Sequence, residues 1–171
     1  MRVIIRQERP QDIAAIHEVN EKAFEETLEA RLVDVLRTNN AVTLSLVAVV
    51  DDQIVGHILF TPVRLETGDR DLEGVGLGPM AVLPDFQRRG IGSKLVNEGL
   101  LKLRELGVSF VVVVGHPEYY PRFGFVLASR FRIRCEWEVP DEVFMILPFD
   151  PSIREGASGL AKYREEFRTM T

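Results

Sequence analysis

The chain has 171 residues, of which 46% are hydrophobic and 27% are charged, a composition that excludes a disordered or fibrous protein. This length suits one domain with a substantial buried core. The formal net charge is -5 at pH 7, which argues against a generally basic surface for nucleic acid. We therefore expect a single globular domain that does not bind nucleic acid.

The residues that could hold a metal are few. The only cysteine, Cys135, excludes an intramolecular disulfide and a cysteine-rich metal site. The three histidines, His17, His57 and His116, do not stand at metal-ligand spacing, so no metal is expected. The chain shows no signal segment, and no apolar run approaches the ~20 residues that span a bilayer. We expect a cytoplasmic protein without a membrane partner.

The N-terminal part predicts a short strand at residues 3–6 and two helices. Pro10 suits the first turn of the first helix. Ile13, Ile16 and Phe24 follow at helical spacing, which predicts that they form its buried face. A break at residues 26–27 precedes a second helix at residues 28–37. The buried side of the second helix is expected to consist of four apolar residues, Leu28, Leu32, Val35 and Leu36.

Two β-rich runs follow, at residues 42–50 and 54–63, and the turn residues between them are typical of a β-hairpin. Pro62 marks the frayed end or the edge of the second strand. A polar loop at residues 66–71 comes next. Glycines at positions 74, 76 and 78 then precede a fourth strand, and they indicate a bulge or the close approach of another backbone or a ligand.

The central stretch joins an apolar strand at residues 77–83 to a helix at residues 93–106 through Gln87-Arg88-Arg89-Gly90-Ile91-Gly92. A helix start offers unpaired N–H groups and the positive end of the helix dipole, so a phosphate or pyrophosphate can bind there. Gly90 and Gly92 let the backbone approach such a ligand, and Arg88 and Arg89 add positive charge. The alternative is an ordinary strand-to-helix turn, because the spacing matches neither common nucleotide-binding glycine motif.

The helix at residues 93–106 and the strand at residues 108–114 complete a β-helix-β crossover. The helix is expected to end at Gly107 and to bury one face, formed by Leu95, Val96, Gly99, Leu100, Leu103 and Leu106. The strand is almost continuously apolar, which indicates that both of its faces are covered and that it runs parallel to the strand before the helix. Later segments predict a turn at 115–120, strands at 131–137 and 143–147, and a loop at 148–156. The pattern of the last segment, at 159–167, does not determine its secondary-structure type.

Two segments carry a resemblance to a known family. Residues 80–92, MAVLPDFQRRGIG, resemble the acetyl-CoA-binding segment of the GNAT superfamily of N-acetyltransferases, whose pattern is Gln/Arg-x-x-Gly-x-Gly/Ala. Residues 120–125, YPRFGF, resemble the later Tyr-x-x-x-Gly-Phe element of the same family. Two motifs in the right order are more specific than either alone. The sequence is most similar to the small bacterial branch marked by Gly-His-Pro-x-Tyr-Tyr, here residues 115–120.

This resemblance implies the fold and the domain organisation. The GNAT acyl-CoA N-acyltransferase fold is an α/β (α+β) fold with a mixed central sheet flanked by helices, in which the fourth and fifth strands splay apart. Residues 1–147 would form this domain, and residues 148–171 would be a C-terminal extension packed on it.

The resemblance also implies acetyl-CoA as co-substrate and a place for each of its parts. The backbone of Met80, Ala81 and Val82 would pair with the pantetheine arm. The turn would hold the pyrophosphate, through seven consecutive residues, Gln87, Arg88, Arg89, Gly90, Ile91, Gly92 and Ser93.

Acetyl transfer to an amine needs a base for the amine, a donor for the thioester oxygen and an acid for the leaving thiolate. The motif assigns the acid to Tyr120, whose phenol stays protonated at neutral pH; the alternative is a packing aromatic residue. The oxyanion donor would be a backbone N–H near Met80 or Val82. One candidate for the base is Glu73, at the start of the fourth strand, where some family members carry a glutamate; alignment on Gln87, however, places Gly76 at the position of that glutamate. The other candidates are His116 and Glu118, each acting through water. An ordered water alone is the remaining option.

The resemblance implies an enzyme, an acetyl-CoA-dependent N-acetyltransferase that acts by direct attack of a primary amine. Cys135 lies outside both motifs, so a covalent route is a lesser alternative. A non-catalytic acyl-CoA-binding or sensing module of the same fold is the alternative from another class, and a nucleotide-phosphate binder is a third. The acceptor, a small-molecule or peptide amine, is not identified by the sequence. In the family, substrates are selected by segments that correspond to residues 24–36 and 135–144, whose carboxylates would attract a cationic amine, and some members are homodimers.

Overall fold

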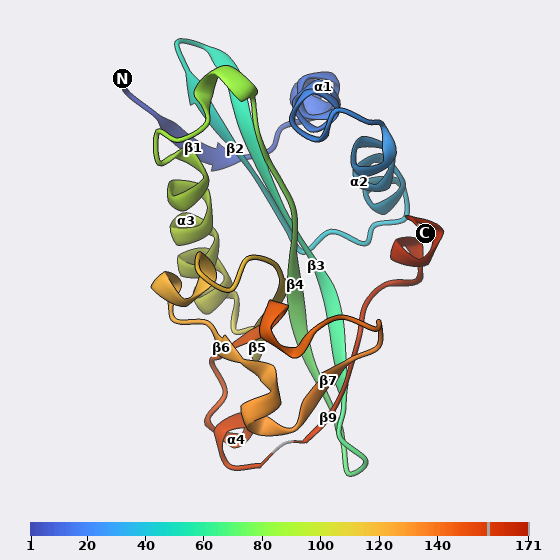
Figure 1. Ribbon diagram of the computed structural model, residues 1–171. Coiled ribbons are helices and arrows are strands. Elements are labelled where there is room, and N and C mark those ends of the chain that lie inside the picture. Colours follow the sequence, from blue (N-terminus) through green and yellow to red (C-terminus); the bar gives the residue numbers. More distant parts are fainter. Residues whose placement is uncertain (157, 171) are drawn as a thin grey trace. The chain divides into compact units, whose positions relative to one another are not determined.

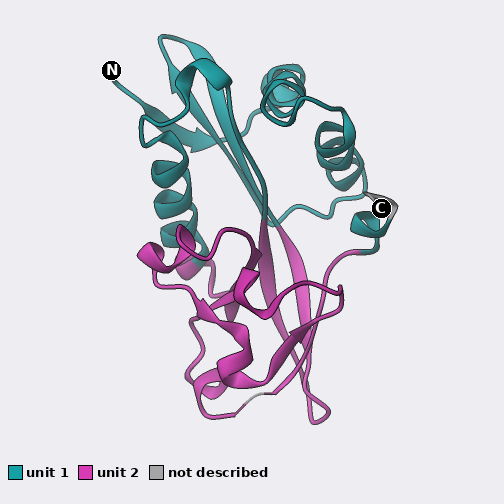
Figure 2. Ribbon diagram, viewed as in Figure 1, with its two compact units in different colours: residues 1–60, 78–103, 165–171 teal, residues 61–77, 104–164 magenta. Residues whose placement is uncertain are grey.

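The computed structural model describes residues 1–156 and 158–170 of the chain (Figure 1). The chain divides into two compact units (Figure 2). Unit 1 contains residues 1–60, 78–103 and those from 165 onward, and unit 2 contains residues 61–77 and 104–164. Among the residues that the structure describes, no helix is long and apolar enough to cross a membrane.

Unit 1 begins with the strand and the two helices that the sequence predicts. These are β1 (Ile4–Gln7), α1 (Ile13–Phe24) and α2 (Leu28–Thr38). A short 3-10 turn at Pro10–Asp12 leads into α1, so the expected place of Pro10 at the helix start is confirmed. Strand β2 (Leu44–Val50) pairs antiparallel with β1 and with β3, which runs from Gln53 to Glu66.

The predicted buried faces of α1 and α2 are partly wrong. Ile16 is fully buried, whereas Ile13 and Phe24 are 38% and 37% exposed, because they are the first and last residues of α1 and lie beside the buried stripe. In α2, Leu28 and Val35 are exposed. The core of unit 1 instead joins these helices to β2 and β3 through a common set of buried residues, Ile16, Leu32, Val33, Leu36, Val47 and Leu59.

The β2–β3 hairpin is confirmed, and Asp51 and Asp52 both have positive φ, as its tight turn requires. The expectation that β3 frays at Pro62 is wrong, because the strand continues to Glu66. Its pairing with β2 ends at Phe60, and its pairing with β9 (Gly159–Lys162) starts at Arg64. Pro62 lies between the β2–β3 ladder and the β3–β9 ladder. Its lack of an N–H therefore removes no hydrogen bond from either ladder.

Strand β4 (Asp71–Val82) returns beside β3 and is longer than expected. The close approach predicted at its glycines is confirmed in unit 2. A Cβ at Gly74 would lie 2.6 Å from the Phe110 backbone and ring, and one at Gly76 would lie 2.6 Å from the Tyr163 ring. These glycines therefore make room for other parts of the chain itself.

Helix α3 (Ile91–Leu106) and strand β5 (Phe110–Val114) form the predicted crossover. Five of the six residues expected on the buried face of α3 are buried, but Leu106 is 61% exposed because it ends the helix, next to Gly107 with its φ of +78°. Strand β5 is parallel to β4, as expected, through Val75↔Val111 and Gly76↔Val112. This ladder stops at Gly76, although β4 continues to Val82.

Unit 2 continues the sheet from β4 through β5, β8 (Phe144–Pro148) and β6 (Val126–Leu127), while β9 lies between β3 and β7 (Ile133–Cys135). The two late strands are thus confirmed, and each pairs with other strands: β7 pairs with β9, and β8 pairs with β5 and β6. The predicted loop at 148–156 contains a short helix, α4 (Pro151–Arg154).

Candidate active site

The turn between β4 and α3 is shaped by its own backbone and by Gln87. The Gln87 side chain donates a hydrogen bond from Nε2 to the Val82 carbonyl at 2.9 Å, which ties the turn to the end of β4. Arg88 and Gly90 both have positive φ, +65° and +81°. Such left-handed residues in a turn direct successive N–H groups toward one place, where an anion can bind. The turn lies entirely in unit 1.

Helix α3 begins at Ile91, two residues before the predicted start, so the motif glycine at 92 belongs to its first turn. The Lys94 N–H donates to the Gly90 carbonyl at 3.1 Å. Earlier amides in a helix have no partner one turn back and are directed out of its N-terminus. Ile91 and Leu95 are buried, and their side chains approach Gly56 of β3 so closely that a Cβ there would lie 3.3 and 3.2 Å from them. This packing fixes the helix start on the sheet.

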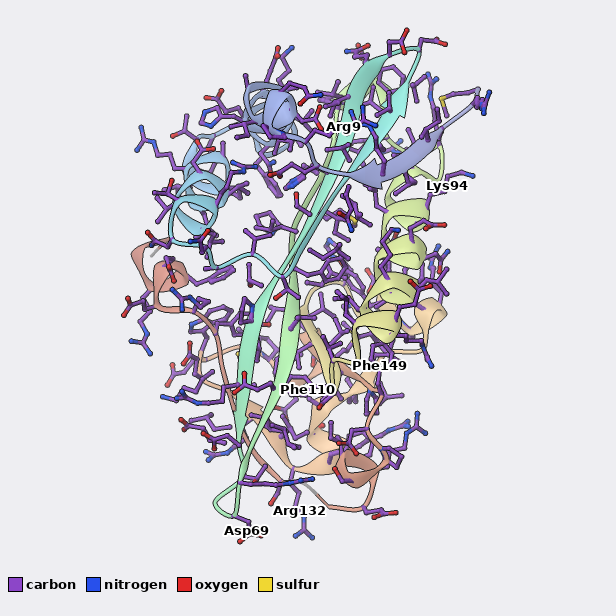
Figure 3. The ribbon with its side chains drawn as sticks, turned by 180° about the vertical axis from the view of Figure 1, so that it is seen from behind. Arg9, Asp69, Lys94, Phe110, Arg132 and Phe149 are labelled. Carbon is purple, nitrogen blue, oxygen red and sulfur yellow. The ribbon has the colours of Figure 1, made fainter. Side chains whose placement is uncertain are left out.

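Positive charge gathers at this helix start. Arg88, Arg89 and Lys94 are exposed and form no ion pair within the described part of the chain. The Arg89 guanidinium lies 5.6 Å from the centre of the Phe86 ring. Lys94 projects from the first turn of α3 (Figure 3), where the helix dipole disfavours a cation. Lys94 was missed at the sequence level, although a lysine in the first turn of a helix is a usable signal for a bound anion.

The end of β4 offers backbone groups to a ligand. The Leu83 N–H donates to the Val55 carbonyl of β3 at 2.8 Å. Because alternate residues of a strand direct their N–H and C=O groups to opposite edges, Ala81 faces β3, whereas Met80 and Val82 face the other edge. The ladder with β5 does not extend past Gly76. Of the three strand residues named from the sequence, Met80 and Val82 therefore have the better placed backbone.

In unit 2, Tyr120 begins a 3-10 turn, Tyr120–Phe123, and is only 7% exposed. Its ring contacts Tyr119 and Phe125 edge to face, with centroid distances of 5.1 and 5.7 Å. Its hydroxyl makes no hydrogen bond to any residue that the structure describes. Burial, followed by the neighbouring Tyr119, raises the pKa of Tyr120 to about 12. The side chain is thus a rigidly held phenol that keeps its proton at neutral pH.

Gly115 makes this position of Tyr120 possible. A Cβ at Gly115 would overlap the Tyr120 ring, so only glycine allows the ring to lie against the chain at the end of β5. The His116 carbonyl accepts the N–H groups of Tyr119 and Tyr120, at 3.1 and 3.3 Å, and so closes the turn. The Gly-His-Pro-x-Tyr-Tyr segment therefore has a structural reason for its glycine.

The three candidate bases differ in their distance from Tyr120. His116 is exposed and lies in the same turn as Tyr120, and Glu118 is exposed beside them. Glu73 is also exposed, but its carbonyl accepts the Ser109 N–H at 3.2 Å, just before β5 begins. Since Tyr120 follows the end of β5, the strand separates Glu73 from it by roughly 20 Å at ~3.3 Å per residue. The structure thus brings His116 to Tyr120 and leaves Glu73 at the opposite end of β5.

Comparison with known proteins agrees with this arrangement. Residues 4–128 match the model of the family described as Acetyltransferase (GNAT) domain. An uncharacterized N-acetyltransferase of Escherichia coli, YhbS, is 37% identical over 166 residues, which cover 96% of this chain and 98% of that protein.

Two solved structures are similar over nearly the whole chain. The crystal structure of E. coli YhbS in complex with CoA has a TM-score of 0.91 and 37% identity, covering 98% of this chain and 93% of that one. A GNAT family acetyltransferase from Brucella melitensis, in complex with acetyl-CoA, has a TM-score of 0.80 and 40% identity, covering 97% of this chain and 98% of that one. The expected fold is therefore confirmed, and the chain belongs to the GNAT family of N-acetyltransferases.

Proposed function

We propose that this protein transfers the acetyl group of acetyl-CoA to a primary amine by direct attack of the amine on the thioester. The observation that carries the proposal is the start of α3, where a turn with two left-handed residues meets three exposed cations without ion-pair partners in the described chain. The pyrophosphate of CoA has the charge and size for such a site. The similar proteins from E. coli and B. melitensis were solved with CoA and acetyl-CoA.

In this proposal the turn residues, Gln87, Arg88, Arg89, Gly90, Ile91, Gly92 and Ser93, form the pyrophosphate-binding site. Arg88, Arg89 and Lys94 supply charge, whereas Gln87 shapes the turn through its bond to Val82. The pantetheine arm pairs with the edge of β4 along Met80, Ala81 and Val82. A backbone N–H of Met80 or Val82 then stabilises the negative charge that develops on the thioester oxygen.

Tyr120 is proposed as the acid for the leaving thiolate. Its pKa of about 12 lies well above the ~8.5 of an ordinary thiol, so complete proton transfer from the phenol is unfavourable. Tyr120 therefore acts mainly by donating a hydrogen bond to the sulfur as its charge develops. The hydroxyl has no hydrogen-bond partner among the described residues, which supports this role, because a phenol used only for packing would gain stability from a partner.

Direct attack is favoured over an acyl-enzyme. Burial raises the pKa of the Cys135 thiol, and a protonated thiol is a poor nucleophile. For the base, we propose His116, acting through a water, since it shares the turn of Tyr120. Glu73 is the weaker candidate because of its place at the other end of β5, and an ordered water alone remains the simplest alternative.

The proposal also covers the branch of the family, the domain bounds, the acceptor and the oligomeric state. The Gly-His-Pro-x-Tyr-Tyr segment is proposed as the mark of a branch, because its glycine, Gly115, makes room for the Tyr120 ring. Residues 1–147 are proposed as the catalytic domain and 148–171 as its C-terminal extension. The acceptor is proposed to be a small-molecule or peptide amine. The protein is also proposed to form a homodimer, which light scattering would test.

The decisive experiment compares thermal stabilisation by acetyl-CoA, CoA and ATP in the wild type and in Lys94→Glu. A ligand that binds only the folded protein at ~100 times its Kd adds about 2.7 kcal/mol. Lys94→Glu replaces a cation by an anion at a helix N-terminus, which should raise the stability of the free protein by roughly 0.3–1 kcal/mol. The same change should reduce stabilisation by CoA.

Lys102→Glu is the matched control, because it makes the same charge change near the other end of α3. This variant should keep the stabilisation by CoA. If neither CoA nor acetyl-CoA stabilises the wild type, the cofactor assignment is wrong. Stabilisation without release of free CoA in the presence of a broad amine panel would instead indicate the non-catalytic acyl-CoA-binding module.

A further inference from the structure

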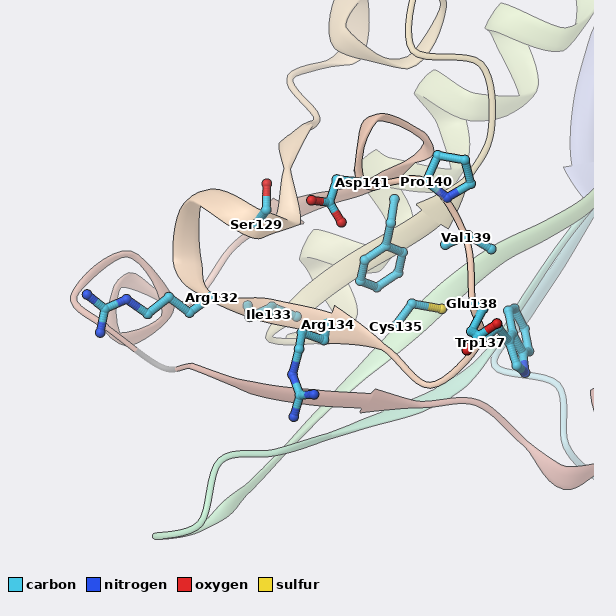
Figure 4. Close-up of a pocket in the computed structure, with 11 residues that line it drawn as sticks. Ser129, Arg132, Ile133, Arg134, Cys135, Trp137, Glu138, Val139, Pro140 and Asp141 are labelled. Carbon is cyan, nitrogen blue, oxygen red and sulfur yellow. The ribbon is translucent and has the colours of Figure 1, made fainter.

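A pocket lies within unit 2, beside strand β7 (Figure 4). Its volume is about 640 Å³, within the range of sites that bind ligands of considerable size. One wall consists of β7 and the residue before it, Arg132, and the opposite wall is the segment 137–141. The pocket therefore runs along a strand over its whole length, which is unusual for a site that takes a small compact ligand.

Strand β7 uses only one of its edges within the described structure. It pairs in parallel with β9, and no other strand pairs with it. The Gly159 N–H donates to the Arg132 carbonyl at 3.2 Å, and the Glu136 N–H donates to the Ala161 carbonyl at 3.3 Å. Residues 132 and 136 thus face β9, and Arg134 between them does the same.

The residues between these face the other way. Because backbone groups alternate along a strand, the N–H and C=O groups of Ile133 and Cys135 are directed to the edge opposite β9. Both residues line the pocket, and none of these four groups is hydrogen-bonded to another described residue. An edge with unpaired N–H and C=O groups is a template for another strand.

The charged side chains around the pocket also lack ion-pair partners among the residues that the structure describes. Arg132 and Arg134 flank the start of β7, and Glu138 and Asp141 lie in the opposite segment. None of the four forms an ion pair or a side-chain hydrogen bond with the residues that the structure describes. Arginines just before and within the strand and a carboxylate after it would complement a chain that carries an acidic and a basic residue at its two ends.

We propose that this pocket binds an extended peptide, which adds to the outer edge of β7 through backbone hydrogen bonds. Such strand addition combines backbone affinity with selection by alternate side chains. An antiparallel orientation, the slightly more stable one, places the N-terminal part of the peptide near Glu138 and its C-terminal part near Arg132. The inference goes beyond the proposed function, since it concerns the docking of a polypeptide whether or not that polypeptide is acetylated.

The test measures binding of fluorescent heptapeptides to the full chain without acetyl-CoA. The probe library has lysine at the N-terminal end, glutamate at the C-terminal end, and valine, threonine, isoleucine or serine between them. The best binder is then N-methylated at one position at a time. Strand addition predicts an alternating pattern, in which every second methyl group weakens binding by about tenfold through loss of a ladder hydrogen bond.

Two variants of the protein provide a matched comparison. Cys135→Pro removes the outward N–H of residue 135 without removing a bond to β9, and proline is tolerated at such an edge. Cys135→Ala removes the thiol and keeps the N–H. We expect Cys135→Pro to bind the peptide about tenfold more weakly and Cys135→Ala to bind like the wild type. If Cys135→Pro does not fold, the methylation pattern on the wild type decides alone. Absence of binding by the whole library, or equal effects of methylation at all positions, would overturn the proposal.

Discussion

The stability of unit 1 is expected to fall as the pH drops from about 6.5 toward 4, because of one buried histidine. His57 lies in β3 and is completely buried. Its Nε2 is 3.0 Å from the Ser45 hydroxyl, and its Nδ1 is 3.2 Å from Asn20 Nδ2. The Ser45 hydroxyl in turn donates to a Glu8 carboxylate oxygen at 2.6 Å. Every residue of this chain of hydrogen bonds belongs to unit 1.

These contacts fix the proton of the imidazole. The carboxylate of Glu8 can only accept, so the single proton of Ser45 is used there and the Ser45 oxygen accepts from His57 Nε2–H. Nδ1 is then the acceptor for the amide of Asn20. A second proton on Nδ1 would face the N–H of Asn20, so the charged ring has no place in this network. Burial, the largest cause, lowers the pKa of His57 to about 4; Glu8 opposes this shift and Arg37 reinforces it.

The size and the sign of the effect follow from this pKa. An unfolded chain has a histidine pKa near 6.5, so below that pH the unfolded state takes up a proton that the folded state refuses until about pH 4. Each pKa unit is worth about 1.4 kcal/mol, and the difference corresponds to about 3 kcal/mol of unfolding free energy. This contribution is complete above pH 6.5 and is lost progressively as the pH falls to about 4.

The assay is urea unfolding between pH 7.5 and 4.5, together with a proton NMR titration of the His57 ring. Burial raises the pKa of the Glu8 carboxyl, but hydrogen bonds from Arg37 and Ser45 outweigh it and hold that pKa below its ordinary value; the hydrogen bond from Arg6 lowers the pKa of Asp12 against opposing burial. The stability that these two carboxyls contribute starts to be lost at about pH 5, where the unfolded chain takes up protons, and this loss is common to the wild type and the control. The control is His57→Gln, whose amide can donate to Ser45 and accept from Asn20 without titrating. It should be less stable at pH 7.5, yet lose less stability than the wild type between pH 6.5 and 4.5. Equal pH slopes in the two proteins, or a ring that titrates near 6.5, would refute the reasoning.

Two further substitutions test the site and the packing of its helix. Tyr120→Phe removes only the unpaired hydroxyl, so the melting temperature should stay the same while kcat falls by roughly a hundredfold or more; a variant with normal kcat would exclude Tyr120 as the acid. Gly99→Ala in α3 places a Cβ 2.6 Å from the Phe60 ring, and the overpacking, about 1–3 kcal/mol, should exceed the gain of about 1 kcal/mol in helix propensity. Its melting temperature should therefore fall, whereas Asn97→Ala, an exposed site in the same helix, should raise it slightly.

The crossover from β4 through α3 to β5 could be predicted because several local signals agree there. The spacing of Leu95, Val96 and Leu103, the cap at Gly107 and the apolar run of β5 all favour the same structure. The weaker predictions concern elements whose form depends on distant partners. Strand β6 has two residues, and β9 exists because it lies between β3 and β7. Neither has enough residues to produce a periodic pattern of its own.

The buried network around His57 illustrates a second limit. Its four residues are far apart in the sequence. They come from the segment after β1 (Glu8), from α1 (Asn20), from β2 (Ser45) and from β3 (His57). Nothing in the local sequence distinguishes a histidine that is completely buried from one at the surface, because the side chain is compatible with both. By contrast, the turn at residues 87–92 was predicted from residue types that a helix start and an anion both require.

The cations at this turn link stability to function. Lys94 in the first turn of α3 opposes the helix dipole, and Arg88 has a positive φ that few side chains adopt. Both features cost stability in the free protein, and the charge of Lys94 has no ion-pair partner within the described structure. An anion at the helix start would neutralise the first cost and use the N–H groups that the second directs toward it. The free protein should therefore be stabilised more by CoA than by pantetheine, because pantetheine lacks the pyrophosphate that binds at the turn.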